Sequence, residues 1–259
     1  MADRMHALLQ ASYPEVNAGG FTRDDGTIQF YLRVQALLQP GQRVLDFGAG
    51  RGSSLHDPKL PPFKRKLRDL AGDGRFLVGA DVDPAVRENP SLQEAHVLDP
   101  KAPLPFPEHS FDLICSDFVF EHIAEPDRTC RELDRILKPG GWICARTPNR
   151  FGYIALASSA VANRHHGSIL RWLQPFRETR DVFPTVYKLN TPGALRRHFP
   201  ESRYVHCVFR HEAEPTYFGS NRLLWKAGMA ARAVLPDALK NGLMVFLQKR
   251  RVGLDASPH

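Results

Sequence analysis

The stretch with the clearest chemical potential joins one acidic residue to three closely spaced glycines. Asp46 is followed by Gly48, Gly50 and Gly52, and the apolar residues 44–45 come directly before it. Glycines permit a turn that other residues resist, and such a turn after a buried strand brings backbone N–H groups against a ligand. A carboxylate at this point would repel a pyrophosphate and attract a cation. The stretch therefore predicts a site for a small, positively charged ligand.

Further carboxylates stand where later apolar runs end. Asp81 closes the run 75–80, Asp99 closes 95–98, and Asp117 follows the alternating run 111–116. Open α/β sheets place their ligands at the carboxyl ends of the strands, so Asp117 is a candidate for the same site.

The elements that must position these residues read as strands alternating with helices. Apolar spacing predicts a helix over 29–39 that ends at Pro40-Gly41. Pro58, Pro61 and Pro62 forbid one continuous helix from the glycine loop, so we expect the next helix to start only near Phe63.

The remaining pattern indicates an α/β protein. Asp83-Pro84 and Thr191-Pro192 each read as a helix cap followed by a proline. We expect strands over 142–149 and 204–209, while 243–247 reads either as a seventh strand or as the end of a short buried helix.

Together these motifs resemble those of the class I S-adenosylmethionine (SAM) dependent methyltransferases. Asp46 with its glycines resembles the family's motif I, "LPF…SFD" spans residues 104–112, and "ELDRILKPGG" at 132–141 is followed by a strand and "TPN". The resemblance covers residues 42–150 densely. It implies a Rossmann-like, seven-stranded, mostly parallel sheet flanked by helices, with an inserted cap segment after strand five.

The resemblance also implies contacts with SAM as the cofactor. Asp81, with Val82 beside it, would accept hydrogen bonds from the ribose hydroxyls, Asp99 from the adenine amino group, and Ser116 and Asp117 would touch the methionine part. The residues implied in the loop are Asp46, Gly48, Ala49 and Gly50. An ordinary turn remains an alternative reading of Asp99.

A looser resemblance follows residue 150. The segment 181–191 matches "DxFPTxYxxNT", which is similar to a bacterial subgroup of methyltransferase type 11-like enzymes. We expect an arm and helix at 1–40, the SAM-binding core at 41–150, a substrate-binding insertion at 151–190, the rest of the sheet at 191–250 and a tail at 251–259. His165 or His166 is the candidate base, with surface positions as the alternative, and Tyr187 is expected to orient the substrate or merely to pack.

The net charge and the cysteine content limit which ligands and which compartment suit this protein. The 259 residues carry a net charge of +7, which suits an anionic substrate, a membrane surface, RNA or simply a solvated basic surface. The four cysteines form no C-x-x-C pair, so they predict buried thiols in a reducing cytoplasm, not a disulfide or metal framework. We expect neither a signal peptide nor a membrane-spanning segment.

We therefore expect a SAM-dependent methyltransferase that acts on a small-molecule, sugar or lipid-linked acceptor, by O-methylation through direct displacement. An RNA or protein methyltransferase is one alternative, and a non-catalytic SAM-binding module is another. A nicotinamide dehydrogenase fits poorly, because its dinucleotide loop would not favour Asp46 and Ser53 replaces the last glycine or alanine. The acceptor, the methylated atom and the oligomeric state stay open.

Overall fold

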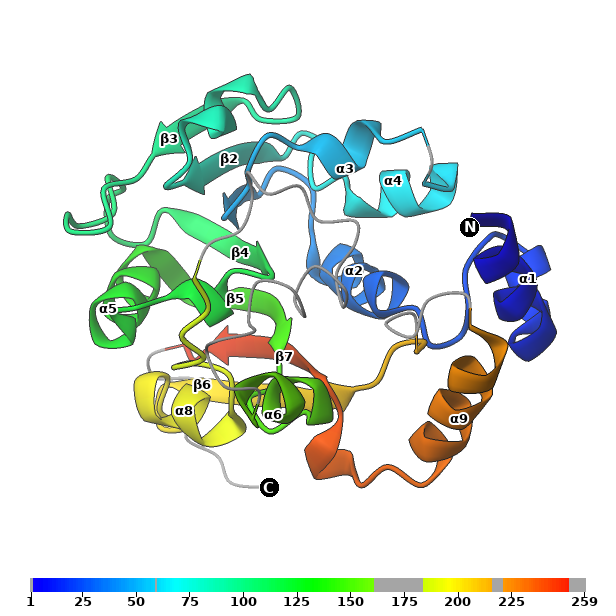
Figure 1. Cartoon of the computed structure of the whole chain (residues 1–259). Coiled ribbons are helices and arrows are strands. Elements are labelled where there is room, and N and C mark those ends of the chain that lie inside the picture. The colour runs from blue at the N-terminus through cyan, green and yellow to red at the C-terminus, as the bar shows by residue number, and fades with distance from the viewer. Residues whose placement is uncertain (1, 59, 161–183, 216–220, 252–259) are drawn as a thin grey trace.

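The computed structural model describes residues 2–58, 60–160, 184–215 and 221–251. At its centre lies a seven-stranded sheet with the order β3-β2-β1-β4-β5-β7-β6 (Figure 1). Neighbouring strands are parallel except for β7, which runs antiparallel to β5 and β6. The strands are β1 (Arg43–Phe47), β2 (Phe76–Asp81), β3 (Glu94–Val97), β4 (Phe111–Asp117), β5 (Leu137–Pro148), β6 (Tyr204–His211) and β7 (Gly242–Lys249). The expected α/β class is confirmed, and residues 243–247, for which a strand or a helix end was expected, lie in strand β7.

Helices cover both faces of this sheet. Alternate residues of β1 point to opposite faces, so Val44 joins one apolar cluster while Leu45 and Phe47 join the other. The first cluster holds α2 (Gly26–Leu37) and α4 (Pro62–Arg68) against the sheet, and the second holds α5 (Pro126–Ile136) and α8 (Pro192–His198). The sheet is therefore buried on both sides, as parallel strands require.

Short helices and turns complete the described chain. They are α1 (Ala2–Ser12), η1 (Pro14–Asn17), α3 (Ser53–His56), η2 (Pro84–Glu88), η3 (Phe120–His122), α6 (Tyr153–Ala160), α9 (Arg222–Ala233) and η7 (Asp237–Leu239). Figure 1 shows α1 and α9 side by side, and the indole N–H of Trp225 donates to Ser12 Oγ at 2.8 Å. No described helix has the length and apolarity needed to cross a membrane.

The structure corrects the expected path after the glycine loop. A single helical turn, α3, begins immediately after Gly52, whose left-handed φ of 68° redirects the chain there. The prolines still end that turn, and Pro62 sits in the first turn of α4, so one long helix is replaced by two short ones. The expected helix after Asp83 is only a 3₁₀ turn, although the Asp83 side chain caps it by accepting from Ala85 N.

Candidate functional site

The glycine loop lies where β1 and β4 part, which is the crossover point of the sheet. Gly48 has a φ of 87°, and its N–H donates to Ala80 O at 2.7 Å. A Cβ added at Gly48 would overlap the Val119 side chain, which follows β4. The glycine therefore permits close contact between two loops that both border the carboxyl ends of the strands.

Asp81 fixes the shape of this loop. Its two carboxylate oxygens accept from Gly50 N at 2.8 Å and from Asp83 N at 2.9 Å. Each oxygen keeps a second lone pair, so both remain able to accept from a ligand. A Cβ at Gly50 would meet nothing within 4 Å, which means that the loop is open on that side.

Asn89 is a loop anchor that sequence reasoning missed. Its side-chain amide donates to Ala49 O at 3.3 Å and to Gly50 O at 3.2 Å, and its side chain stands where a Cβ at Gly52 would fall. A buried asparagine after a short helical turn is a weak signal, because many such residues only cap their own turn.

Asp46 lies among like charges. Burial is the main cause that raises the pKa of its carboxyl to about 7, and the negative charges of Asp117 and Asp81 add to it, while Arg68 acts in the opposite direction. A cation placed here would favour the ionised carboxylate. The carboxylates of this site would therefore bind a positively charged ligand favourably.

Asp117 forms an ion pair with an arginine of the same chain. The Arg146 guanidinium donates to both of its carboxylate oxygens at 2.7 Å, and Tyr31 Oη donates to Oδ2 at 3.2 Å. Arg146 is buried, and its guanidinium lies over the rings of Phe118 and Phe30 at 4.6 and 5.6 Å. Asp117 and Arg146 are register partners on β4 and β5, so the pair is part of the sheet itself.

The other expected cofactor residues lie at the same edge in different states of exposure. Ser116 is fully buried, and its hydroxyl has no hydrogen-bond partner among the residues that the structure describes. Val82 is exposed. Asp99 is exposed as well, and it accepts from Lys101 N at 2.8 Å, which is the turn geometry that sequence reasoning left open.

Buried polar contacts bring Tyr187 to this edge. Glu121 is 2% exposed, its side chain accepts from Thr147 Oγ1 at 2.9 Å, and its carbonyl accepts from Tyr187 N at 3.2 Å. The amide of Asn190 donates to Thr147 Oγ1 at 2.7 Å. Tyr187 has a φ of 52°, a conformation that non-glycine residues rarely adopt. His165 and His166 lie outside the described residues.

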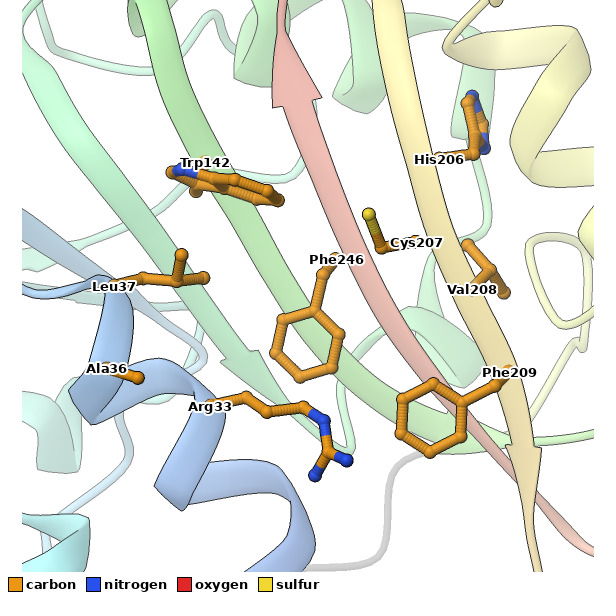
Figure 2. Close-up of a pocket in the computed structure, with 9 residues that line it drawn as sticks. All are labelled: Arg33, Ala36, Leu37, Trp142, His206, Cys207, Val208, Phe209 and Phe246. Carbon is orange, nitrogen blue, oxygen red and sulfur yellow. The ribbon is translucent and has the colours of Figure 1, made fainter.

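Two hollows adjoin the last strands. A groove of about 600 Å³ is lined by residues of α2, β5, β6 and β7, and Figure 2 shows Arg33 reaching toward Phe209 there. This groove runs along one face of the sheet. Trp142, one of its lining residues, lies six residues before the carboxyl end of β5. A polar hollow of about 380 Å³ lies at the carboxyl edge, lined in part by Asp24, His211 and Arg232. Burial lowers the pKa of His211, a histidine that sequence reasoning did not single out.

A metal-binding site is not evident among the residues that the structure describes. Those residues include no group of three or more His, Cys, Asp or Glu side chains arranged to hold a metal ion. The four cysteines are unpaired, and three of them are buried.

Comparisons with known proteins agree with this geometry. A family model described as "Methyltransferase domain" matches residues 63–145, a segment that begins after the glycine loop. A ubiquinone/menaquinone biosynthesis C-methyltransferase of Vibrio campbellii is 31% identical over 112 residues, which are 40% of this chain and 40% of that protein. The corresponding protein of Shewanella frigidimarina is 29% identical over 115 residues, or 41% of this chain and 42% of that protein. This chain thus matches about two fifths of the length of these relatives.

Solved structures extend the likeness to nearly the whole chain. A putative methyltransferase of Haloferax volcanii, solved in complex with the activator Trm112, has a TM-score of 0.53 at 21% identity, covering 90% of this chain and 95% of that one. The [4+2]-cyclase SpnF has a TM-score of 0.51 at 15% identity, covering 86% and 81%. At these identities the likeness concerns the fold alone. The chain thus has the fold of the class I SAM-dependent methyltransferases, and its residues 63–145 match a methyltransferase domain.

Proposed function

We propose that this protein transfers a methyl group from SAM to a small-molecule, sugar or lipid-linked acceptor. One observation carries the proposal: an open glycine loop stands beside Asp46 and Asp81, two carboxylates at the ends of adjacent parallel strands. SAM is cationic at sulfur, so the electrostatics of this edge fit the cofactor. When bound, SAM supplies a methyl carbon that a nucleophile attacks directly.

The residues of the chain take distinct parts in this proposal. Asp81 accepts from the ribose hydroxyls while it keeps the loop in shape. Asp46 meets the positive charge of the cofactor and is ionised by it. Asp117, held by Arg146 and Tyr31, gives the same edge a fixed negative charge. Alignment and exclusion of water then provide most of the rate enhancement.

Oxygen is the acceptor atom that we propose, with Tyr187 orienting the acceptor at the end of β4. Its backbone is tied to Glu121, and its left-handed conformation is the kind of local strain found at functional positions. His165 or His166 remains the proposed base. The relatives are named C-methyltransferases, but they match only two fifths of this chain, so we do not transfer their acceptor.

We also place the reaction in the cytoplasm, where four unpaired cysteines stay reduced. The fold alone does not decide the chemistry, because a cyclase shares it. A SAM-binding module without transfer activity is therefore the alternative to test.

The decisive experiment uses SAM labelled in its methyl group. The protein is incubated with fractionated extract of its host, and label is counted in the RNA, protein, lipid, glycan and small-molecule fractions. Label in one of the last three supports the proposal. Label in RNA or protein overturns the acceptor class, and SAM binding without any transfer overturns the activity.

A further inference from the structure

The outer face of α9 carries an exposed apolar stripe. Leu223 is 80% exposed and Val234, which follows the last residue of the helix, is 81% exposed. They are eleven residues apart, which is close to three helical turns, so they point to the same side. The alanines at 227 and 230 fall between them on that side and are also exposed.

The opposite face of the helix is fixed to the protein. Trp225 is 1% exposed and donates to Ser12, while Arg232 donates to Asp24 Oδ2 at 2.6 Å and to Glu212 O at 3.0 Å. Asn221 caps the helix by accepting from the backbone of residues 223 and 224. These contacts hold the opposite face of α9 against the protein, so the stripe faces outward.

The charged residues of α9 itself are all basic. No acidic residue occurs between 215 and 236, and Arg222 and Lys226 are both exposed on the helix. The next acidic residue, Asp237, is paired with Arg210 at 3.1 Å and with Lys240 at 3.0 Å. An apolar strip flanked by cations, on a chain of net charge +7, complements a surface that is apolar below and anionic above.

The connection that carries the stripe begins and ends on the same edge of the sheet as the site. The connection that contains α9 leaves β6 at His211 and enters β7 at Gly242, and these two residues are register partners. Gly242 in turn pairs with Pro148 at the carboxyl end of β5. Contact through α9 would thus be made on the edge where the glycine loop opens.

We propose that α9 docks this protein onto an anionic membrane surface. Leu223 and Val234 enter the boundary of the acyl chains, while Arg222 and Lys226 remain among the phosphates. This inference goes beyond the proposed function and does not depend on it, because the interaction needs neither SAM nor an acceptor.

Cosedimentation with vesicles tests the proposal without any activity measurement. The full chain is mixed with vesicles of phosphatidylcholine alone or of phosphatidylcholine and phosphatidylglycerol at 3:1. We expect binding to the anionic vesicles, weakened at least about tenfold in the double variant Leu223→Asp/Val234→Asp, because two apolar side chains no longer leave water. Leu32→Asp, at another exposed helical leucine, is the matched control and should bind as the unsubstituted protein does.

A second variant separates the two parts of the interaction. Arg222→Ser/Lys226→Ser keeps the stripe, and we expect it to weaken binding and reduce its dependence on salt. Failure of the protein to bind anionic vesicles would overturn the proposal. So would binding that the α9 variants leave unchanged, or a dimer in solution that Leu223→Asp/Val234→Asp dissociates, since that would assign the stripe to a second copy of the chain.

Discussion

Replacing Asp46 by asparagine should make the cofactor-free protein more stable at neutral pH and less able to bind SAM. The pKa of this carboxyl is about 7 in the fold against an ordinary value of 3.8. The folded state therefore holds the proton more tightly than the unfolded state, and stability falls as the pH rises from about 4 to 7. A shift of about 3 units corresponds to about 4 kcal/mol at most above pH 7.

Only part of this effect lies in the range where the protein is easily studied. About 2 units of the window lie above pH 5, so Asp46→Asn should gain about 2–3 kcal/mol over the unsubstituted protein between pH 5 and pH 8. Urea unfolding of both proteins at the two pH values gives this difference, and titrating groups that do not interact with Asp46 cancel in it. A stability gap that does not widen with pH would refute the electrostatic reasoning.

Calorimetric titration with SAM completes the test. The unsubstituted protein should bind about tenfold more tightly at pH 8 than at pH 6, because binding below the pKa requires loss of a proton from Asp46. Asp46→Asn should bind weakly at both pH values. Any titration of SAM itself affects both proteins equally, so the variant serves as the control.

Four further predictions concern the glycine loop, the sheet and the acceptor side of the site. Asp81→Ala should weaken SAM binding by about 1–3 kcal/mol, measured by calorimetry, and unchanged affinity would remove Asp81 from the site. Gly48→Ala should cost about 1–3 kcal/mol of unfolding free energy, and adding Val119→Ala should restore part of it; equal stability of the single and double variants would contradict the proposed overlap. Arg146→Met should cost about 3–5 kcal/mol in urea unfolding because it strands a largely buried carboxylate, so a neutral result would show that the ion pair is replaceable. Tyr187→Phe should keep SAM affinity and lower turnover of labelled SAM, and full activity would exclude its hydroxyl from the reaction.

The order of elements was predictable because it depends on local patterns. Apolar runs ended by glycines and prolines located the strands, and the caps at Asp83 and Thr191 follow from side chains that bond within three residues. The acidic residues at the strand ends were also visible, since strand direction alone places them at one edge. The family resemblance implied a seven-stranded, mostly parallel sheet, and the structure has one.

Contacts between distant segments were not predictable in the same way. The pairing of Asp117 with Arg146 depends on the register of β4 against β5, which the sequence patterns did not predict. Thr147 donates a hydrogen bond to Glu121 and accepts one from Asn190, and the second depends on where a later segment returns to the sheet. The helical turn α3 was missed because four residues carry too little periodicity to register as a helix.

The antiparallel last strand has a consequence for how such a protein can diversify. His211 and Gly242 face each other across β6 and β7, so the thirty residues between them begin and end at neighbouring points of a rigid frame. Closing a longer or shorter connection there changes the chain entropy only slowly with length and leaves the strands in place. This connection can therefore vary in length and sequence between related proteins, together with the surface that it presents. The half of the sheet that carries the glycine loop can stay unchanged.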